Sequence, residues 1–405
     1  MSRLAPAQAP PPALPAAFLF AALGWGAGAG FALAVTDPGA LSTRWSPALL
    51  ALTHAFTLGL LGNALVGGLL QFLPAAAGGG RVGRTWGLAV GAALNLGTGL
   101  LLLHFHGVSP VWPAAALLGP GLSTAVLGLW GAVATVQPPA LRSGLRVSLL
   151  GLVLTLGLGL WLLAARAGFI GGARLLLVDL HAMLGLWVWV FGVLLCVCSL
   201  AVPMLQGLAR WSPHALPRLL AVNLCCLLLA IALRTSNLPL ASAALALPVV
   251  LTAALYLWHL LHSPWRRNLP LRAFFCLATI VLIPAAVSLI QTEPPLGLLI
   301  WGLAGLALLV FAMAIEILAF LAWSALQRHI GRGRRLPGVH QLQSDRCKWL
   351  AFGLASLALL LLGLGFGPVE SLRTFGAALF GAVHLLGIAM AMAGFLRARA
   401  FARSG

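Results

Sequence analysis

Hydrophobic residues in this chain gather in long, nearly uninterrupted runs. Runs of about 20 residues, each enough to cross a bilayer core of ~30 Å as an α-helix, follow one another from one end of the sequence to the other. Short segments rich in Gly, Pro and polar residues separate them, and the two-residue alternation of a membrane β-barrel is not seen. The pattern predicts an all-α polytopic membrane protein.

Twelve membrane spans are predicted in all, and they form a single transmembrane domain over residues 14–396. A Pro/Ala-rich segment at 1–13 is expected to be disordered, a long polar loop covers 327–347, and a basic tail covers 397–405. The predicted spans are 14–36, 48–73, 84–106, 111–136, 145–166, 175–203, 215–233, 238–261, 271–291, 296–323, 348–366 and 375–396.

Composition agrees with the membrane class, since 61% of residues are hydrophobic, 7% are charged and the mean hydropathy is +1.04. The net charge of +18 is very unevenly distributed between alternate loops. Of 24 basic residues, 19 fall on the side that includes both termini, and the five on the other side are Arg44, Arg166, Arg174, Arg234 and Arg373. By the positive-inside rule both termini are cytoplasmic. The basic excess orients the chain and contacts anionic lipid, and does not indicate nucleic-acid binding.

Three histidines lie inside predicted spans that descend from the outer side: His54, His181 and His384. A polar side chain in hydrocarbon is costly without a partner, so each needs an explanation. Neutral imidazoles ligate haem iron, and two of them on facing helices give a six-coordinate site. Alternatively, each histidine simply forms a hydrogen bond to a neighbouring helix.

Glycines stand close to two of these histidines in the sequence. Gly185 follows His181 by four residues, while Gly381 and Gly387 flank His384 at three residues on either side, which puts each glycine on the histidine's helical face. We expect the missing side chains to leave room for a macrocycle. The alternative is close helix packing, the common use of glycine in membranes.

The spans that carry His54 and His181 resemble each other weakly. Each has a histidine near its outer end followed by glycine and leucine, and a proline 20 or 22 residues later, at Pro74 and Pro203. The similarity indicates either an old duplication or the frequent recurrence of Gly, Leu and Ala in membrane helices.

Three stretches carry a family resemblance. LTHAFTLGLLGNALVGGLLQFLPAAAG resembles the second span of bacterial relatives of haem-copper oxidase subunit I, including the NnrS family of haem- and copper-containing membrane proteins. HAMLGLWVWVFGVLLCVCSLAVPMLQG is similar to the sixth-span counterpart, and VHLLGIAMAMAGFLRAR resembles the histidine-bearing last span of NnrS-like chains. The number of spans is similar too.

The resemblance implies a bundle like that of oxidase subunit I, with His54 as a haem ligand and His181 and His384 as haem or copper ligands. Haem b, and copper beside it, are the cofactors it implies, with a periplasmic redox partner. By the same resemblance, His54 is one axial ligand and either His384 or His181 is the other.

The chain departs from the oxidase pattern at the oxygen-reducing centre. Oxidases of this type carry histidines in spans seven and ten, whereas 215–233 and 296–323 contain none here. The only tyrosine, Tyr256, is near the cytoplasmic end of its span. We therefore expect that the protein is not a terminal oxidase.

Other polar groups have competing explanations. Glu316, inside span ten, is either part of a proton path or a helix-packing hydrogen bond, and it is expected to be buried. Asp179 is predicted to cap the outer end of its helix. His104 and His106 are two more candidates near the outer surface, and His259 and His262 fit an interfacial belt beside Trp and Arg residues.

The leading hypothesis is an inner-membrane protein that binds haem, with or without copper, and acts in electron transfer, metal or haem handling, or the response to nitric oxide or respiratory stress. A proton-coupled secondary transporter is the alternative, because twelve spans, a weak repeat and a buried carboxyl also suit that class. A cofactor-free assembly subunit is the third possibility.

Overall fold

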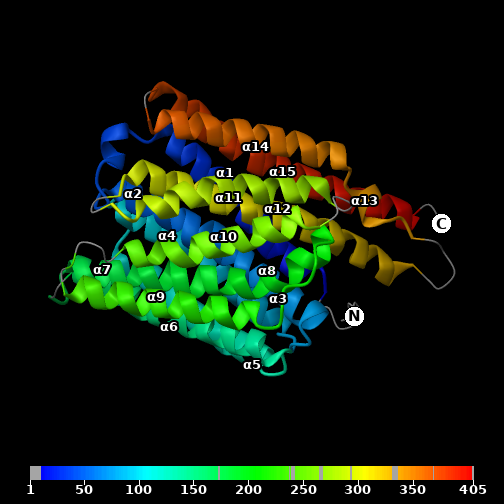
Figure 1. Cartoon of the computed structure of the whole chain (residues 1–405), viewed down its shortest axis with the longest axis horizontal. Coiled ribbons are helices and arrows are strands. Elements are labelled where there is room, and N and C mark those ends of the chain that lie inside the picture. Colours follow the sequence, from blue (N-terminus) through cyan, green and yellow to red (C-terminus); the bar gives the residue numbers. More distant parts are fainter. Residues whose placement is uncertain are drawn as a thin grey trace.

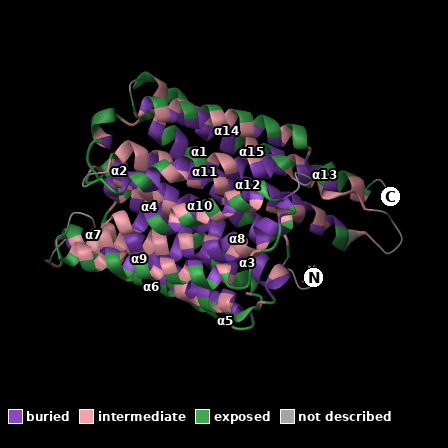
Figure 2. Ribbon diagram, in the orientation of Figure 1, coloured by how far each residue is buried: buried purple, intermediate pink, exposed green. Residues whose placement is uncertain are grey.

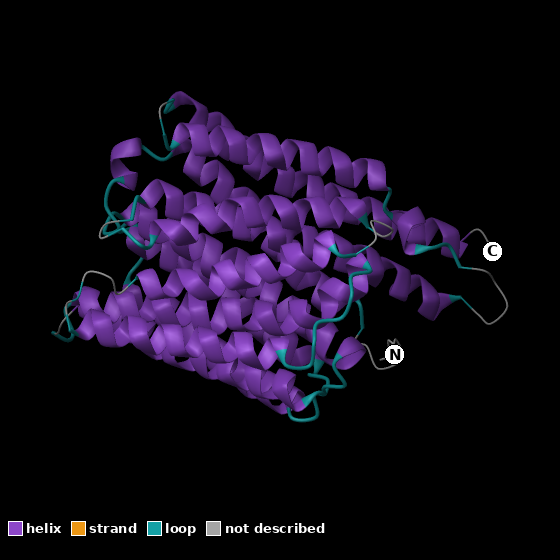
Figure 3. Cartoon of the chain, in the orientation of Figure 1, coloured by secondary structure: helices purple, strands orange, loops and turns teal. Residues whose placement is uncertain are grey.

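The computed structural model describes residues 11–171, 174–236, 238, 242–263, 268–291, 294–330, 336–367 and 369–403. Every regular element within these residues is a helix (Figure 3). Twelve of the helices, counted with their continuous π and 3-10 segments, are long and apolar enough to cross a membrane. The prediction of a twelve-span all-α membrane protein is confirmed.

The observed spans begin and end within seven residues of the predicted boundaries. They are α1 (Ala13–Val35), α2, η3 and α3 (Pro47–Ala76), α4 (Arg84–Phe105), α5 (Val111–Val133), α6 (Pro139–Arg166), α7, η4 and α8 (Leu175–Gln206), α9 (Ala215–Thr235), η5 and α10 (Ala243–Leu261), α11 (Leu269–Ser288), α12 (Leu296–Arg328), α14 (Asp345–Gly365) and α15 (Ser371–Arg403). Two short elements, η2 (Pro38–Leu41) and α13 (Val339–Leu342), lie between spans. Residues 1–10 of the expected disordered segment lie outside the described residues, and Ala13 is already helical.

Both termini lie at one end of the bundle, where the ends of α12 and α15 extend past the other helices (Figure 1). We call this the terminal end. α2 and α7 lie at the opposite end (Figure 1). An even number of spans returns the chain to its starting side, as the charge pattern requires. Arg3, Arg266, Arg267, Arg332, Arg334 and Arg335, which contribute to that pattern, lie outside the described residues.

The first and last spans are neighbours, because α1 packs against α15, and both pack against α12. Buried residues line the inner faces of these helices, and exposed ones face outward (Figure 2). Large apolar side chains such as Leu127 and Leu396 are exposed, as expected for a surface that meets lipid.

An amide network joins α1, α3 and α4 beside the first π segment. Asn63 and Asn95 donate to each other's side-chain oxygens at 3.0 and 3.2 Å, and Trp25 donates its indole N–H to Asn95 at 2.7 Å. Asn63 also donates to the carbonyl oxygen of Gly59 at 2.7 Å. A Cβ on Gly59 would lie 2.5 Å from the Trp25 ring, so only glycine fits there. Hydrogen bonds of this kind fix helix register in a membrane, where water cannot compete.

Candidate functional site

The structure brings two of the three membrane histidines together. The imidazole of His54, the last residue of α2 (Pro47–His54), and that of His181, in α7 (Arg174–Met183), have centroids 6.3 Å apart and planes inclined by 24°. They come from the two spans whose sequences resemble each other.

A π-helical segment follows each of these two histidines. η3 (Ala55–Gly62) begins directly after His54, and η4 (Leu184–Val190) begins three residues after His181. No other π segment is found in the described part of the chain. A π-helix gives up the regular i to i−4 bonding, and such segments occur frequently at functional sites. The two spans therefore share a backbone irregularity as well as a sequence pattern.

Both rings are held through the same nitrogen. His54 Nδ1 lies 2.8 Å from the carbonyl oxygen of Leu50, and His181 Nδ1 lies 3.0 Å from that of Thr155 on α6. Because a carbonyl only accepts, Nδ1 carries the proton and donates in each case. Nε2 is then left with its lone pair, which is the arrangement of a metal-ligating histidine whose other nitrogen fixes the ring.

The separation of the rings suits a shared metal. A metal ion bound at about 2.0–2.1 Å by one nitrogen of each imidazole places the two ring centroids about 6 to 6.5 Å apart when the rings lie on opposite sides of it. The observed 6.3 Å falls in this interval. The centroid separation of the pair is therefore compatible with one metal ion between the two rings.

Aromatic and small residues surround the pair. The Phe105 ring lies 5.1 Å from that of His54, and the guanidinium carbon of Arg166 lies 5.8 Å from the centroid of the Phe105 ring. A Cβ on Gly159 would lie 3.1 Å from Cε1 of His181, so α6 approaches this imidazole closely. His54 and His181 are both partly exposed.

His104 and His106 do not join the pair. His104 Nδ1 lies 3.1 Å from the carbonyl oxygen of Ser109, and His106 is exposed. It is Phe105, between them, that contacts His54. His104 and His106 therefore belong to the end of α4 and are not part of the site formed by His54 and His181.

His384 lies apart from the other two. It is completely buried in α15, with Phe380 and Phe311 rings at 4.5 and 5.2 Å, and a Cβ on Gly26 of α1 would lie only 2.2 Å from its ring. Its Nδ1 is 2.9 Å from the carbonyl oxygen of Phe380. Within the described residues, no three His, Cys, Asp or Glu side chains gather closely enough to hold a metal ion, so the three histidines do not form one centre.

The glycines expected to leave room for a macrocycle are in close contact with neighbouring helices instead. A Cβ on Gly185 would lie 3.1 Å from Thr155, one on Gly381 would lie 3.0 Å from the Ala27 carbonyl, and one on Gly387 would lie 2.4 Å from Phe311. That expectation is wrong at these positions, where glycine permits close packing. Any macrocycle at the pair needs space from the exposed side of the two rings.

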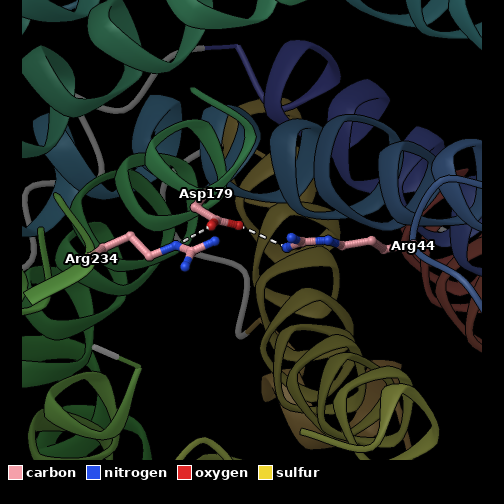
Figure 4. Close-up of polar contacts among 3 residues, drawn as sticks. All are labelled: Arg44, Asp179 and Arg234. Carbon is pink, nitrogen blue, oxygen red and sulfur yellow. Dashed lines mark hydrogen bonds and ion pairs between the residues drawn. The ribbon is translucent and has the colours of Figure 1, made fainter. Parts of the chain in front are cut away.

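Asp179 joins three elements around the site (Figure 4). Its carboxylate lies 2.7 Å from a terminal nitrogen of Arg44, in the segment before α2, and 2.5 Å from Nε of Arg234, in the last turn of α9. Asp179 lies inside α7, so the prediction that it caps the helix end is wrong. The ion cluster Arg44–Asp179–Arg234 instead connects the helix of His181 to the segment that leads into the helix of His54.

Glu316 lies on α12, nearer to the terminal end of the bundle than the ion cluster Arg44–Asp179–Arg234. It forms an ion pair with Lys348 of α14, whose Nζ lies 2.5 Å from a Glu316 oxygen. Lys348 is the only lysine in the chain, and it was not predicted to be the partner of Glu316. His259 and His262 lie beside Trp211 and Trp258 at the end of α10, in agreement with an aromatic belt.

Comparison with known proteins finds no family model that matches this chain and no match among curated proteins. The function proposed for this chain is therefore based on the positions and contacts of its own residues.

Proposed function

We propose that this chain is a haem-binding protein of the bacterial inner membrane in which His54 and His181 are the two axial ligands of one haem iron. The observation that carries the proposal is the pair of imidazoles at 6.3 Å, each with Nδ1 directed to a backbone carbonyl. Haem b is the cofactor expected from the resemblance of the histidine spans to oxidase-like proteins.

Two protein nitrogens suit haem better than a bare metal ion. A haem iron already has four equatorial nitrogens from the macrocycle, so the protein needs to add only axial ligands. Copper or zinc ions in proteins are usually held by three or four side chains. A copper ion at the pair is therefore the second candidate, and His384 would serve neither centre directly.

The protein's own residues perform three tasks in this proposal. Leu50 and Thr155 hold the two rings through Nδ1, so that Nε2 of each would be unprotonated and able to hold the iron. Phe105 covers one side of His54 and limits the approach of water. The haem, when bound, supplies an iron that gains and loses one electron.

The pair belongs to helices at the end opposite the termini (Figure 1). With the termini in the cytoplasm, as the charge asymmetry predicts, this end faces the periplasm and a periplasmic redox partner can approach it. Electron transfer, or haem or metal handling, follows from such a position. Reporter fusions at Arg403 and Gly107 test the orientation: we expect cytoplasmic and periplasmic signals, respectively.

A visible spectrum and metal analysis of the detergent-purified protein test the proposal directly. We expect a reddish protein with a Soret band that sharpens on reduction and about one iron per chain, as one bis-imidazole site requires. A colourless protein that binds copper supports the second candidate. A colourless protein without metal contradicts both, and leaves the transporter and assembly-subunit hypotheses.

A further inference from the structure

The inner part of the bundle contains a second group of ionisable side chains that the haem site does not use. Glu316 and Lys348 are almost completely buried, with 8% and 6% of their side chains exposed, and are 2.5 Å apart. Asp345, one turn before Lys348 in α14, lies 3.8 Å from the same Nζ and is 61% exposed. The three residues run from the surface at the terminal end into the bundle, in the order Asp345, Lys348 and Glu316.

The choice of basic residue at this position is informative. Of the 24 basic residues in the chain, 23 are arginines, and the single lysine is the one buried against Glu316. A guanidinium stays charged in proteins, whereas a buried lysine amine can give up its proton. An ion pair that only joins two helices could use arginine, as Asp179 does with Arg44 and Arg234. The pair at Glu316 has the chain's single lysine, whose amine can transfer a proton where a guanidinium cannot.

We propose that Asp345, Lys348 and Glu316 form a proton-exchange site that opens to the terminal end of the bundle. In the ion pair, the protonated Nζ–H group of Lys348 lies beside the Glu316 carboxylate, with Nζ 2.5 Å from Oε1. Transfer breaks that N–H bond and forms an O–H bond on Glu316, which leaves a neutral amine and a neutral carboxylic acid. The amine lone pair then accepts a proton that Asp345 passes from water, so the site gains one proton and one positive charge.

Two neighbouring arginines are engaged elsewhere, whereas Arg346 and Cys347 lie between Asp345 and Lys348 in the sequence of α14. Arg397 of α15 donates to the carbonyl oxygen of Leu342, and Arg272 of α11 donates to that of Gln206. α1, η3 and α3, which also pack against α12, contain no titratable side chain. The remaining titratable groups on the packed elements are Cys276 of α11, Arg328 and His329 of α12, His340 of α13, Arg346 and Cys347 of α14, and Arg373, His384, Arg399 and Arg403 of α15.

Infrared titration of the full-length protein in lipid nanodiscs tests this site without reference to haem. We expect the wild type to gain a carboxylic-acid C=O band as the pH falls, and Glu316→Gln to lose that band. A pH-jump measurement should show proton uptake slowed by about 100-fold in Asp345→Asn, within the range of about 10²–10⁴ for a positioned proton donor.

Lys348→Arg separates proton exchange from a structural role, because arginine keeps the charge and the ion pair but not the proton transfer. We expect this variant to fold like the wild type and to lose rapid proton uptake. Wild-type uptake in both Lys348→Arg and Asp345→Asn would overturn the proposal, as would a Glu316→Gln protein that retains the band. Since none of these measurements requires a metal, failure here leaves the haem proposal untouched, and the reverse also holds.

Discussion

His54 and His181 on one side, and His384 on the other, have the same local geometry but different surroundings. All three lie in membrane helices and direct Nδ1 to a backbone carbonyl within 3.0 Å. The first two face each other and are partly exposed, and each is followed by a π segment. His384 is sealed between phenylalanine rings and against Gly26. Under the proposed function, the neighbours and the exposure of a membrane histidine decide whether it binds a ligand.

Removing the imidazoles one at a time tests whether His54 and His181, and not His384, bind the haem. We expect His54→Ala and His181→Ala each to reduce haem affinity by more than about 100-fold, because loss of a ligand exceeds the 10–100-fold cost of losing an outer-shell partner. His384→Ala should keep its haem. Haem per chain, from the absorption of purified variants, measures the effect.

His104→Ala is the matched control, since it removes an imidazole at the same end of the bundle that is bonded to Ser109. If His384→Ala loses haem while His181→Ala keeps it, the pairing of His54 with His181 is wrong.

The next largest expected effect is on stability, and it follows from a substitution that disturbs the contact between Gly26 and His384. Gly26→Ala would place a Cβ 2.2 Å from the buried ring, so the packing of α1 against α15 must shift, at a cost of about 1–3 kcal/mol. Thermal unfolding in detergent should show a lower midpoint with unchanged haem content.

Gly28→Ala serves as its control, because a Cβ at that position of the same helix meets nothing within 4 Å. We expect Gly28→Ala to be neutral or slightly stabilising, since alanine is favoured over glycine in a helix by about 0.5–1 kcal/mol. Equal midpoints for the two variants would show that the α1 to α15 contact is loose.

The ion cluster Arg44–Asp179–Arg234 should have the smallest effect. Its arginines are partly exposed, and exposed ion pairs contribute about 1 kcal/mol or less. We therefore expect Asp179→Asn to lower haem affinity by less than about tenfold, through a looser placement of α7, and Asp179→Glu to restore part of it. Asp37→Asn is the control, because Asp37 accepts only a local hydrogen bond from Gly39 among its contacts described here. Haem titration of the apoprotein measures both.

Much of the fold could be predicted from the sequence, because long hydrophobic runs have one solution in a bilayer and charge asymmetry orients them. His54 and His181 could be chosen as candidates for the same reason, since polar groups are rare in such runs. Which two of three histidines meet could not be predicted, because all three spans descend from the same side and depth alone does not distinguish them.

The polar contacts were harder to predict than the helices. Asp179 was expected to cap a helix, but its carboxylate meets arginines that are 135 and 55 residues away in the sequence. The glycines near His181 and His384 were expected to leave room for a macrocycle. Instead, they pack closely against Thr155, Phe311 and the backbone of α1. Such partners are set by helix packing across the whole chain. The presence of a single lysine in the chain was the one sequence feature that could have indicated the partner of Glu316.

The packing of α1 against α15 has a consequence for biosynthesis. α1 is synthesised eleven spans before α15, the helix that packs against it. Until then the groove around Gly26 and Gly30 must be filled by lipid or by an insertion factor, and the contact is among the most distant in sequence that the chain makes. The contact between α1 and α15 therefore forms only after α15 has been synthesised, and chains truncated before Ser371 should be recognised by membrane quality-control proteases.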